Sequence, residues 1–144
     1  HSLAHLHRAI MEGVAFAGAR HLHVMEQASQ QKVERVMASG GAAKTPLWLE
    51  IKSSIYGVPL LVPEEAECGV IGSAVMAATA LGRFNNLADG VSRFVRYAAE
   101  VKPNPRWKDT YARMQPVFNR IYNNSQPLYA DLDALLTNNA SSKE

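Results

Sequence analysis

Residues 36–48 read VMASGGAAKTPLW, a short apolar run that enters a pair of glycines and then a segment able to form a helix. Glycine lets the backbone approach a ligand that a side chain would hold away. A helix after such a turn begins with unpaired N–H groups and a partial positive charge, which favour an anionic oxygen. The stretch has two interpretations: a phosphate-binding loop, or a turn that only redirects the chain.

The segment before this stretch predicts an amphipathic helix over the first 29 residues, which needs a surface to pack on. Its apolar positions recur at helical spacing; they are Leu3, Leu6, Ile10 and Val14, roughly extended by Ala17 and Met25. A strand-like run over residues 33–38 follows and leads into the glycines.

The segments after the glycines predict a helix over residues 45–56 and a second strand over 58–62. Pro46 suits the first turn of that helix, because its missing N–H has no partner to lose there. Gly57 suits the end of the helix. A helix of small residues over 68–80 comes next, which favours either tight helix packing or close approach to a ligand.

The remaining chain predicts only helices and turns. We expect helices over residues 87–97 and 107–123, with a break at Pro103-Asn104-Pro105 between them. A last helix carries Leu128 through Leu136, and residues 138–144 form a polar tail that we expect to be frayed.

The order helix, strand, helix, strand, helix predicts an α/β fold with parallel strands joined by helical crossovers. Two strands do not make a stable sheet. We therefore expect further strands N-terminal to His1 or from another copy of the chain, and the exposed edges and apolar helix face predict a homo-oligomer.

The composition is that of a globular domain: 144 residues, of which 47% are hydrophobic and 19% are charged. The 15 Lys and Arg residues are scattered among 13 Asp and Glu residues, so nucleic acid is not an expected partner. The sequence shows neither a membrane-spanning apolar run nor a signal peptide. Cys68 is a lone cysteine, read as a buried, inert thiol, and predicts a reducing, cytoplasmic location.

The five histidines raise the question of a metal site. His1 and His5 share one face of the first helix, but His7 does not, and no Cys or acidic cluster completes a ligand set. The sequence therefore predicts no metal bound by side chains of this chain.

Three ordered motifs give the chain a resemblance to the C-terminal part of an FGGY-family carbohydrate kinase over nearly its whole length. HLHRAIMEG at residues 5–13 resembles the back half of the family's C-terminal signature. SGGAAKTPLW at 39–48, followed by GVP at 57–59, is similar to the family's adenosine loop and next strand. ECGVIGSA at 67–74 resembles the small-residue helix near the end of the nucleotide lobe. Together these motifs favour the ligand-loop interpretation.

The resemblance implies a partial actin-like, ribonuclease-H-like ATPase lobe with additional C-terminal helices, with residues 1–137 forming part of the ATP-binding lobe. By resemblance, Gly40 and Gly41 would press against the α-phosphate and ribose, and the N–H of Ala42 would add a donor. Thr45 falls where some members place an adenine-contacting polar residue. Many members have a third glycine at the position of Ala42, and many have Ala-Asp at Ser53-Ser54.

The resemblance also implies the activity of the complete enzyme: transfer of the γ-phosphoryl group of ATP, bound with Mg²⁺, to a sugar or polyol hydroxyl, with an aspartate as base. In the family, the catalytic aspartate and the sugar contacts lie in the N-terminal lobe, so no catalytic residue is expected here and this chain alone is expected to be inactive. We expect four other aspartates to be solvated or capping acids; they are Asp89, Asp109, Asp131 and Asp133. The alternative is a non-catalytic assembly module that keeps the half-fold.

Overall fold

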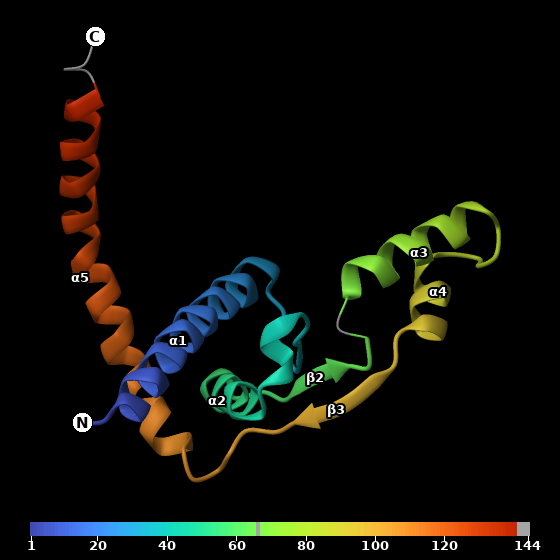
Figure 1. Cartoon of the computed structure of the whole chain (residues 1–144), viewed down its shortest axis with the longest axis horizontal. Coiled ribbons are helices and arrows are strands. Elements are labelled where there is room, and N and C mark those ends of the chain that lie inside the picture. Colours follow the sequence, from blue (N-terminus) through green and yellow to red (C-terminus); the bar gives the residue numbers. More distant parts are fainter. Residues whose placement is uncertain (66, 141–144) are drawn as a thin grey trace. The chain divides into compact units, whose positions relative to one another are not determined.

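The computed structural model describes residues 1–65 and 67–140, and it divides into two compact units, His1–Lys108 and Asp109–Glu144. The first unit contains α1 (Leu3–Ser29), β1 (Val36–Met37), the 3₁₀ helix η1 (Gly41–Lys44), α2 (Pro46–Tyr56), β2 (Leu60–Pro63), α3 (Cys68–Ala80), α4 (Leu87–Phe94) and β3 (Tyr97–Val101) (Figure 1). The helix α5 (Lys108–Ala140) accounts for the described part of the second unit.

The sheet has the order β1-β2-β3. β1 and β2 are parallel, with Val36 opposite Leu60, which confirms the predicted parallel pair. β2 and β3 are antiparallel, with Leu60 opposite Val101. The third strand corrects the sequence-based prediction, because the helix expected over residues 87–97 ends at Phe94 and the chain then returns along β2.

α2 begins and ends at the residues that predicted its bounds. Pro46 occupies the first turn, after Thr45 in an extended conformation. Gly57 adopts the left-handed conformation (φ +72°) and donates its N–H to the carbonyl of Ser53. α2 packs on the sheet through a core formed by Ala38, Leu49 and Leu60, with Val36, Ala43, Tyr56, Val62 and Val101 packed against it.

The helix α1 has the predicted length but packs through another face than its regular apolar stripe. Ala15 and Phe16 are its buried residues, and α1 contacts α2. The stripe is exposed: Leu3 is 68% exposed and Ile10 is 57% exposed. Sequence periodicity therefore identified the helix and a second apolar face, but missed the face that packs.

Helices α3 and α4 form a small core of their own. Val75 of α3 is buried, and a Cβ added to Gly90 of α4 would collide with Val75 and Phe84. The rings of Phe84 and Phe94 meet edge to face, with centroids 5.7 Å apart. Cys68, predicted to be buried, is partly exposed at the start of α3.

A single helix, α5, replaces the two helices predicted after residue 107, and both Pro116 and Pro127 lie inside it. An interior proline removes one backbone hydrogen bond and disfavours helix, but does not always end one. Residues 138–140 of the predicted polar tail belong to α5, and residues 141–144 lie outside the described part of the chain.

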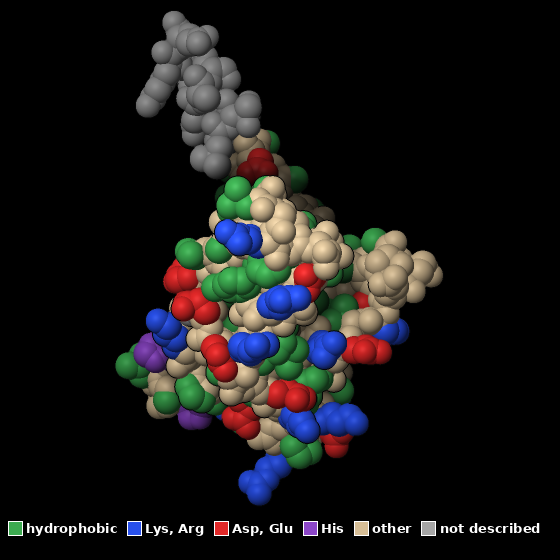
Figure 2. Space-filling view, turned by 90° about the vertical axis from the view of Figure 1, so that its right-hand side faces the viewer, with side chains coloured by type: hydrophobic (Ala, Val, Ile, Leu, Met, Phe, Trp, Pro, Cys, Tyr) green, Lys and Arg blue, Asp and Glu red, His purple; other side chains and the backbone are tan. Residues whose placement is uncertain are grey.

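Charged side chains are interspersed on the face drawn in Figure 2, where Lys and Arg lie among Asp and Glu and between apolar groups. This agrees with the scattered basic residues of the sequence. Within residues 1–65 and 67–140, no helix is both long and apolar enough to cross a membrane.

Candidate functional site

The glycine loop leaves the sheet at the carboxyl end of β1, the edge at which open parallel sheets bind ligands. Ala38 still pairs with β2, because its N–H donates to the carbonyl of Leu61 at 2.9 Å. Gly40 then turns the chain with φ +76° and ψ −168°, a combination that is essentially restricted to glycine. Its carbonyl accepts the N–H of Ala43 at 3.0 Å and so closes the first turn of η1.

The space around both glycines is open. A Cβ added to Gly40 or to Gly41 would meet no heavy atom within 4 Å, apart from the residue itself and its chain neighbours. Packing therefore does not require glycine at either position. The backbone requires it at Gly40 alone, so redirection of the chain does not account for the second glycine. An uncovered backbone is what a ligand-binding loop needs, so Gly40 and Gly41 leave room for a phosphate-bearing ligand.

The other predicted site residues lie on the same short segment. Ala42 is within η1, and Gln30 is the only non-glycine residue with positive φ in the described part of the chain, so Ala42 does not need to be glycine. Thr45 is the N-cap residue of α2, but its side chain makes no capping hydrogen bond. The loop and Thr45 are thus contiguous, and the hydroxyl of Thr45 is not used to cap the helix.

Lys44 and the contacting pair Trp48 and Lys52 follow the glycine loop in the chain. Lys44 ends η1 and is exposed, whereas Trp48 and Lys52 are partly buried. The ammonium nitrogen of Lys52 lies 4.6 Å from the centroid of the Trp48 ring, a cation–π distance. Partial burial lowers the pKa of Lys52. Sequence reasoning did not single out this pair, although the i, i+4 spacing of an aromatic and a cation was a usable signal.

Ser53 and Ser54, which depart from the family pattern, fasten α2 to other parts of the first unit. Ser53 is fully buried, and its hydroxyl lies 2.9 Å from the carbonyl of Val58 and 2.8 Å from that of Val101. Ser54 donates to the carbonyl of Glu50 at 2.6 Å and accepts the N–H of Asn104 at 2.9 Å. The two serines therefore have a structural role.

The backbone and side-chain polar groups of Asn104 all form hydrogen bonds where the turn at residues 103–105 meets α2. Its side-chain amide donates to the carboxylate of Glu50 at 2.8 Å, and its side-chain oxygen accepts the N–H of Arg106 at 2.9 Å. Its carbonyl accepts the N–H of Trp107 at 3.1 Å. The predicted break at residues 103–105 is thus an ordered turn that is held against the helix following the glycine loop.

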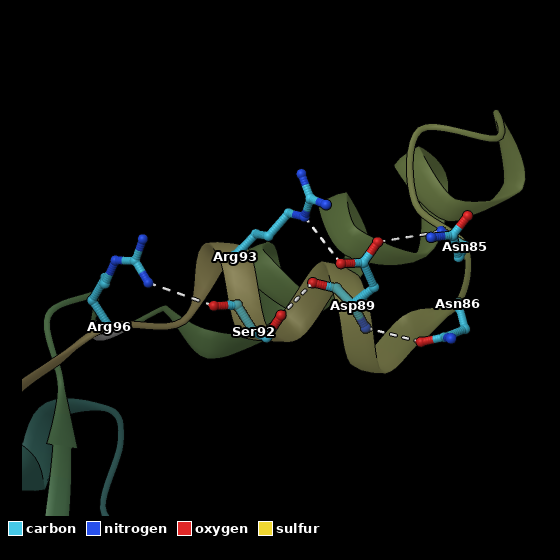
Figure 3. Close-up of polar contacts among 6 residues, drawn as sticks. All are labelled: Asn85, Asn86, Asp89, Ser92, Arg93 and Arg96. Atoms are coloured by element: carbon cyan, nitrogen blue, oxygen red, sulfur yellow. Dashed lines mark hydrogen bonds and ion pairs between the residues drawn. The ribbon is translucent and has the colours of Figure 1, made fainter.

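Asp89, one of the acids expected to be solvated or capping, organises the start of α4 (Figure 3). Its N–H donates to the side chain of the N-cap residue Asn86 at 2.9 Å, and its carboxylate pairs with Arg93 at 3.0 Å. The hydrogen bond from Arg93, followed by one from the backbone of Asn85, lowers the pKa of Asp89. This arrangement is a helix cap, which confirms the expectation for Asp89.

A cavity of about 300 Å³ lies between the end of β1, α3 and α4. Its wall is mostly apolar and includes Met37, Cys68, Val75 and Phe94. Met37 comes three residues before Gly40 in the sequence. No group of three or more His, Cys, Asp or Glu side chains within the described residues could hold a metal ion.

A family model matches more than half of the chain. The chain belongs to the FGGY family of carbohydrate kinases, because the model of that family's C-terminal domain matches residues 1–81.

Its relatives in sequence are sugar kinases. The autoinducer-2 kinase of Enterobacter sp. (strain 638) is 33% identical over 119 residues, covering 83% of this chain and 22% of that protein. The xylulose kinase of Bacillus subtilis (strain 168) is 28% identical over 138 residues, covering 96% of this chain and 28% of that protein. The chain thus spans about a quarter of the length of these relatives.

Solved structures of the same class share the fold. The xylulose kinase from Rhodospirillum rubrum matches with a TM-score of 0.76 and 26% identity, over 90% of this chain and 26% of that one. The ligand-bound xylulose kinase from Lactobacillus acidophilus matches with a TM-score of 0.73 and 25% identity, over 87% of this chain and 25% of that one. The small mixed sheet with its helices is consistent with part of a kinase lobe.

Proposed function

We propose that this chain is the nucleotide-binding part of an ATP-dependent kinase that phosphorylates a hydroxyl group of a sugar or polyol. The observation that carries the proposal is the open Gly40-Gly41 backbone at the carboxyl edge of the parallel strands, in a chain of the FGGY family. The relatives are named for xylulose and autoinducer-2, which supports a carbohydrate acceptor and leaves the individual sugar open.

In this proposal the chain binds and orients ATP, which enters with Mg²⁺ and supplies the phosphoryl group. Gly40 and Gly41 lie against the α-phosphate and ribose, because no side chain fills the space above their backbone. The N–H of Ala42 is a further donor, and Thr45 contacts the adenine. Lys44 places a positive charge beside the loop and favours an anionic ligand.

The proposed reaction needs groups that this chain does not supply. No aspartate here is assigned as the base, and positioning and charge neutralisation account for most of the catalysis of phosphoryl transfer. We therefore expect the 144-residue chain alone to show no sugar-dependent turnover of ATP. Measurable turnover by the pure chain would contradict this division of roles.

The test is calorimetric titration of the complete protein with MgATP. A Gly41→Asp variant puts bulk and negative charge where the phosphate would lie, so we expect the affinity to fall by roughly tenfold or more. An Ala130→Asp variant adds the same charge at an exposed position of α5 and is the matched control. Unchanged affinity in Gly41→Asp, or no binding by the wild-type protein, would overturn the proposed site.

A further inference from the structure

Trp48 occupies the third position of α2, directly behind the glycine loop. Helical side chains lean toward the helix N-terminus, so a residue covers the surface over the turn that precedes it. For Trp48, that preceding turn contains Lys44 and Thr45. Thr45 is the extended N-cap residue of α2 and its carbonyl accepts the N–H of Leu49 at 3.1 Å, so the turn that Trp48 covers begins at Thr45.

The contact between Lys52 and Trp48 supports this direction. The Lys52 ammonium reaches one turn back and lies 4.6 Å from the centroid of the Trp48 ring. Lys52 and Trp48 therefore form a short row along α2, which begins two residues after η1. Both members of the pair keep part of their surface exposed, so the row remains accessible to a ligand.

The chemistry of this row fits the non-phosphate end of a nucleotide. An indole offers a broad apolar surface that stacks on, or meets the edge of, a purine ring. A cation over the indole restricts its rotation and leaves the rest of the ring for another contact. A phosphate on the open glycine backbone would leave the attached base within reach of the first turn of α2.

We propose that Trp48 is a nucleobase-binding residue, with its indole in contact with the purine of the bound nucleotide and held by Lys52. This inference rests on the proposed function, since it extends the same site by one helical turn. It adds a base contact that is separate from the phosphate contacts of Gly40 and Gly41.

The chain offers a matched control in its second tryptophan. Trp107 also lies under a cation, with the guanidinium carbon of Arg8 4.3 Å from its ring centroid. The two residues share the same side chain and the same kind of partner, but Trp107 belongs to the turn before α5, not to the helix behind the loop. A response confined to Trp48 would therefore report a local contact.

The experiment labels the complete protein with 5-fluorotryptophan and assigns the two fluorine resonances with Trp48→Phe and Trp107→Phe variants. Saturating MgATP should shift the Trp48 resonance and leave that of Trp107 in place. Calorimetry should show that Trp48→Ala weakens MgATP binding by roughly tenfold and Trp48→Phe by less, because phenylalanine keeps part of the stacking surface. Both variants should bind tripolyphosphate as the wild type does.

The possible outcomes separate the two proposals. If MgATP binds but the Trp48 resonance and the affinities of both variants stay unchanged, the base contact is wrong and the nucleotide site stands. If Trp48→Phe and Trp48→Ala weaken tripolyphosphate binding as much as MgATP binding, Trp48 only supports the fold of the loop and the inference fails. If the wild type binds no MgATP, the proposed function fails and this inference falls with it.

Discussion

Gly40 and Gly41 are adjacent, but the structure requires glycine only at Gly40. Gly40 has φ +76° and ψ −168°, a conformation that L residues rarely adopt. Gly41 begins η1 without a positive φ, and a Cβ there would meet nothing within 4 Å. The backbone therefore selects the first glycine, and access to a ligand gives a reason for the second.

This difference predicts separate effects of two alanine substitutions. Gly40→Ala should lower the free energy of unfolding by about 1–3 kcal/mol, because it places a Cβ in a glycine-only conformation. Gly41→Ala should change the free energy of unfolding by less than about 1 kcal/mol, since neither sterics nor φ opposes it. Urea denaturation of the two variants measures the difference. Equal destabilisation of both would show that the loop conformation does not discriminate between the glycines.

Gly18 is required by a close neighbour, because a Cβ at this position would collide with the hydroxyl of Tyr56. We expect Gly18→Ala to destabilise the chain by about 1–3 kcal/mol, since either the Tyr56 ring must shift out of its packed position or α1 and α2 must move apart. Tyr56→Phe removes the colliding oxygen, so the double variant should recover part of the loss. Thermal unfolding of both single variants and the double variant completes a cycle, and independent, additive effects would contradict the contact.

At the scale of elements, the sequence predicted the helix bounds that neighbouring residues determine. Pro46 at the first helical position and the C-cap Gly57 gave the bounds of α2 to within one residue. Residues 97–101 have no strong strand signal, and β3 forms because β2 offers hydrogen-bonding partners far away in the sequence. Two sets of apolar positions suggested two helices after residue 107, yet α5 is one helix that continues through Pro116 and Pro127. Tertiary pairing and tolerated prolines are not visible in local propensity.

The candidate site likewise has a part that the sequence predicted and a part that it did not. The glycine loop was predictable, because its residues are adjacent and their spacing carries the family resemblance. The junction of Ser54 with Asn104 was not, because it joins residues that lie 50 positions apart through one hydrogen bond of 2.9 Å. The Trp48–Lys52 pair lies between these cases: its spacing is local, but the position of the ammonium over the ring is a property of the three-dimensional structure.

The connection from α1 to β1 depends on one carboxylate. Glu26 accepts the N–H of Val33 at 2.9 Å and pairs with Lys32 at 3.5 Å. The backbone hydrogen bond from Val33 is the largest influence and lowers the pKa of Glu26 below its ordinary value of 4.5. A lowered pKa in the folded state means that the unfolded chain binds the proton more readily, so this contribution to stability exists above pH 4.5 and is lost as the pH falls through the folded pKa.

We therefore predict a pH-dependent effect of Glu26→Gln. At neutral pH the variant should unfold more easily than the wild type, and the difference should shrink as the pH falls from about 6 to about 3. Urea denaturation across this range measures it. Glu34→Gln, an exposed carboxylate in the same connection, is the control. A difference between Glu26→Gln and wild type that stays constant across the range would contradict the role of the ionised carboxylate.

At the scale of the whole molecule, the main feature is apolar surface that the chain does not cover. The stripe on α1 runs from Leu3, 68% exposed, past Leu6 and Ile10, each 57% exposed, to Met25, 61% exposed. At 1.5 Å per residue it extends for about 33 Å along the helix. Helix α3 adds exposed Val70 and Met76. An apolar stripe of this length in water is typical of an interface.

Because the chain spans about a quarter of its relatives' length, this surface leads to a prediction about the 144-residue chain by itself. We expect the isolated chain to self-associate through the α1 stripe, since pairing removes this apolar surface from water. Light scattering should give a concentration-dependent mass above 15.8 kDa. Ile10→Glu puts a charge in the middle of the stripe and should lower the mass toward that of the monomer. Leu81→Glu, at the exposed end of α3, should not. A mass of 15.8 kDa at every concentration would mean that the stripe does not drive association, and an equal response to both variants would place the contact elsewhere.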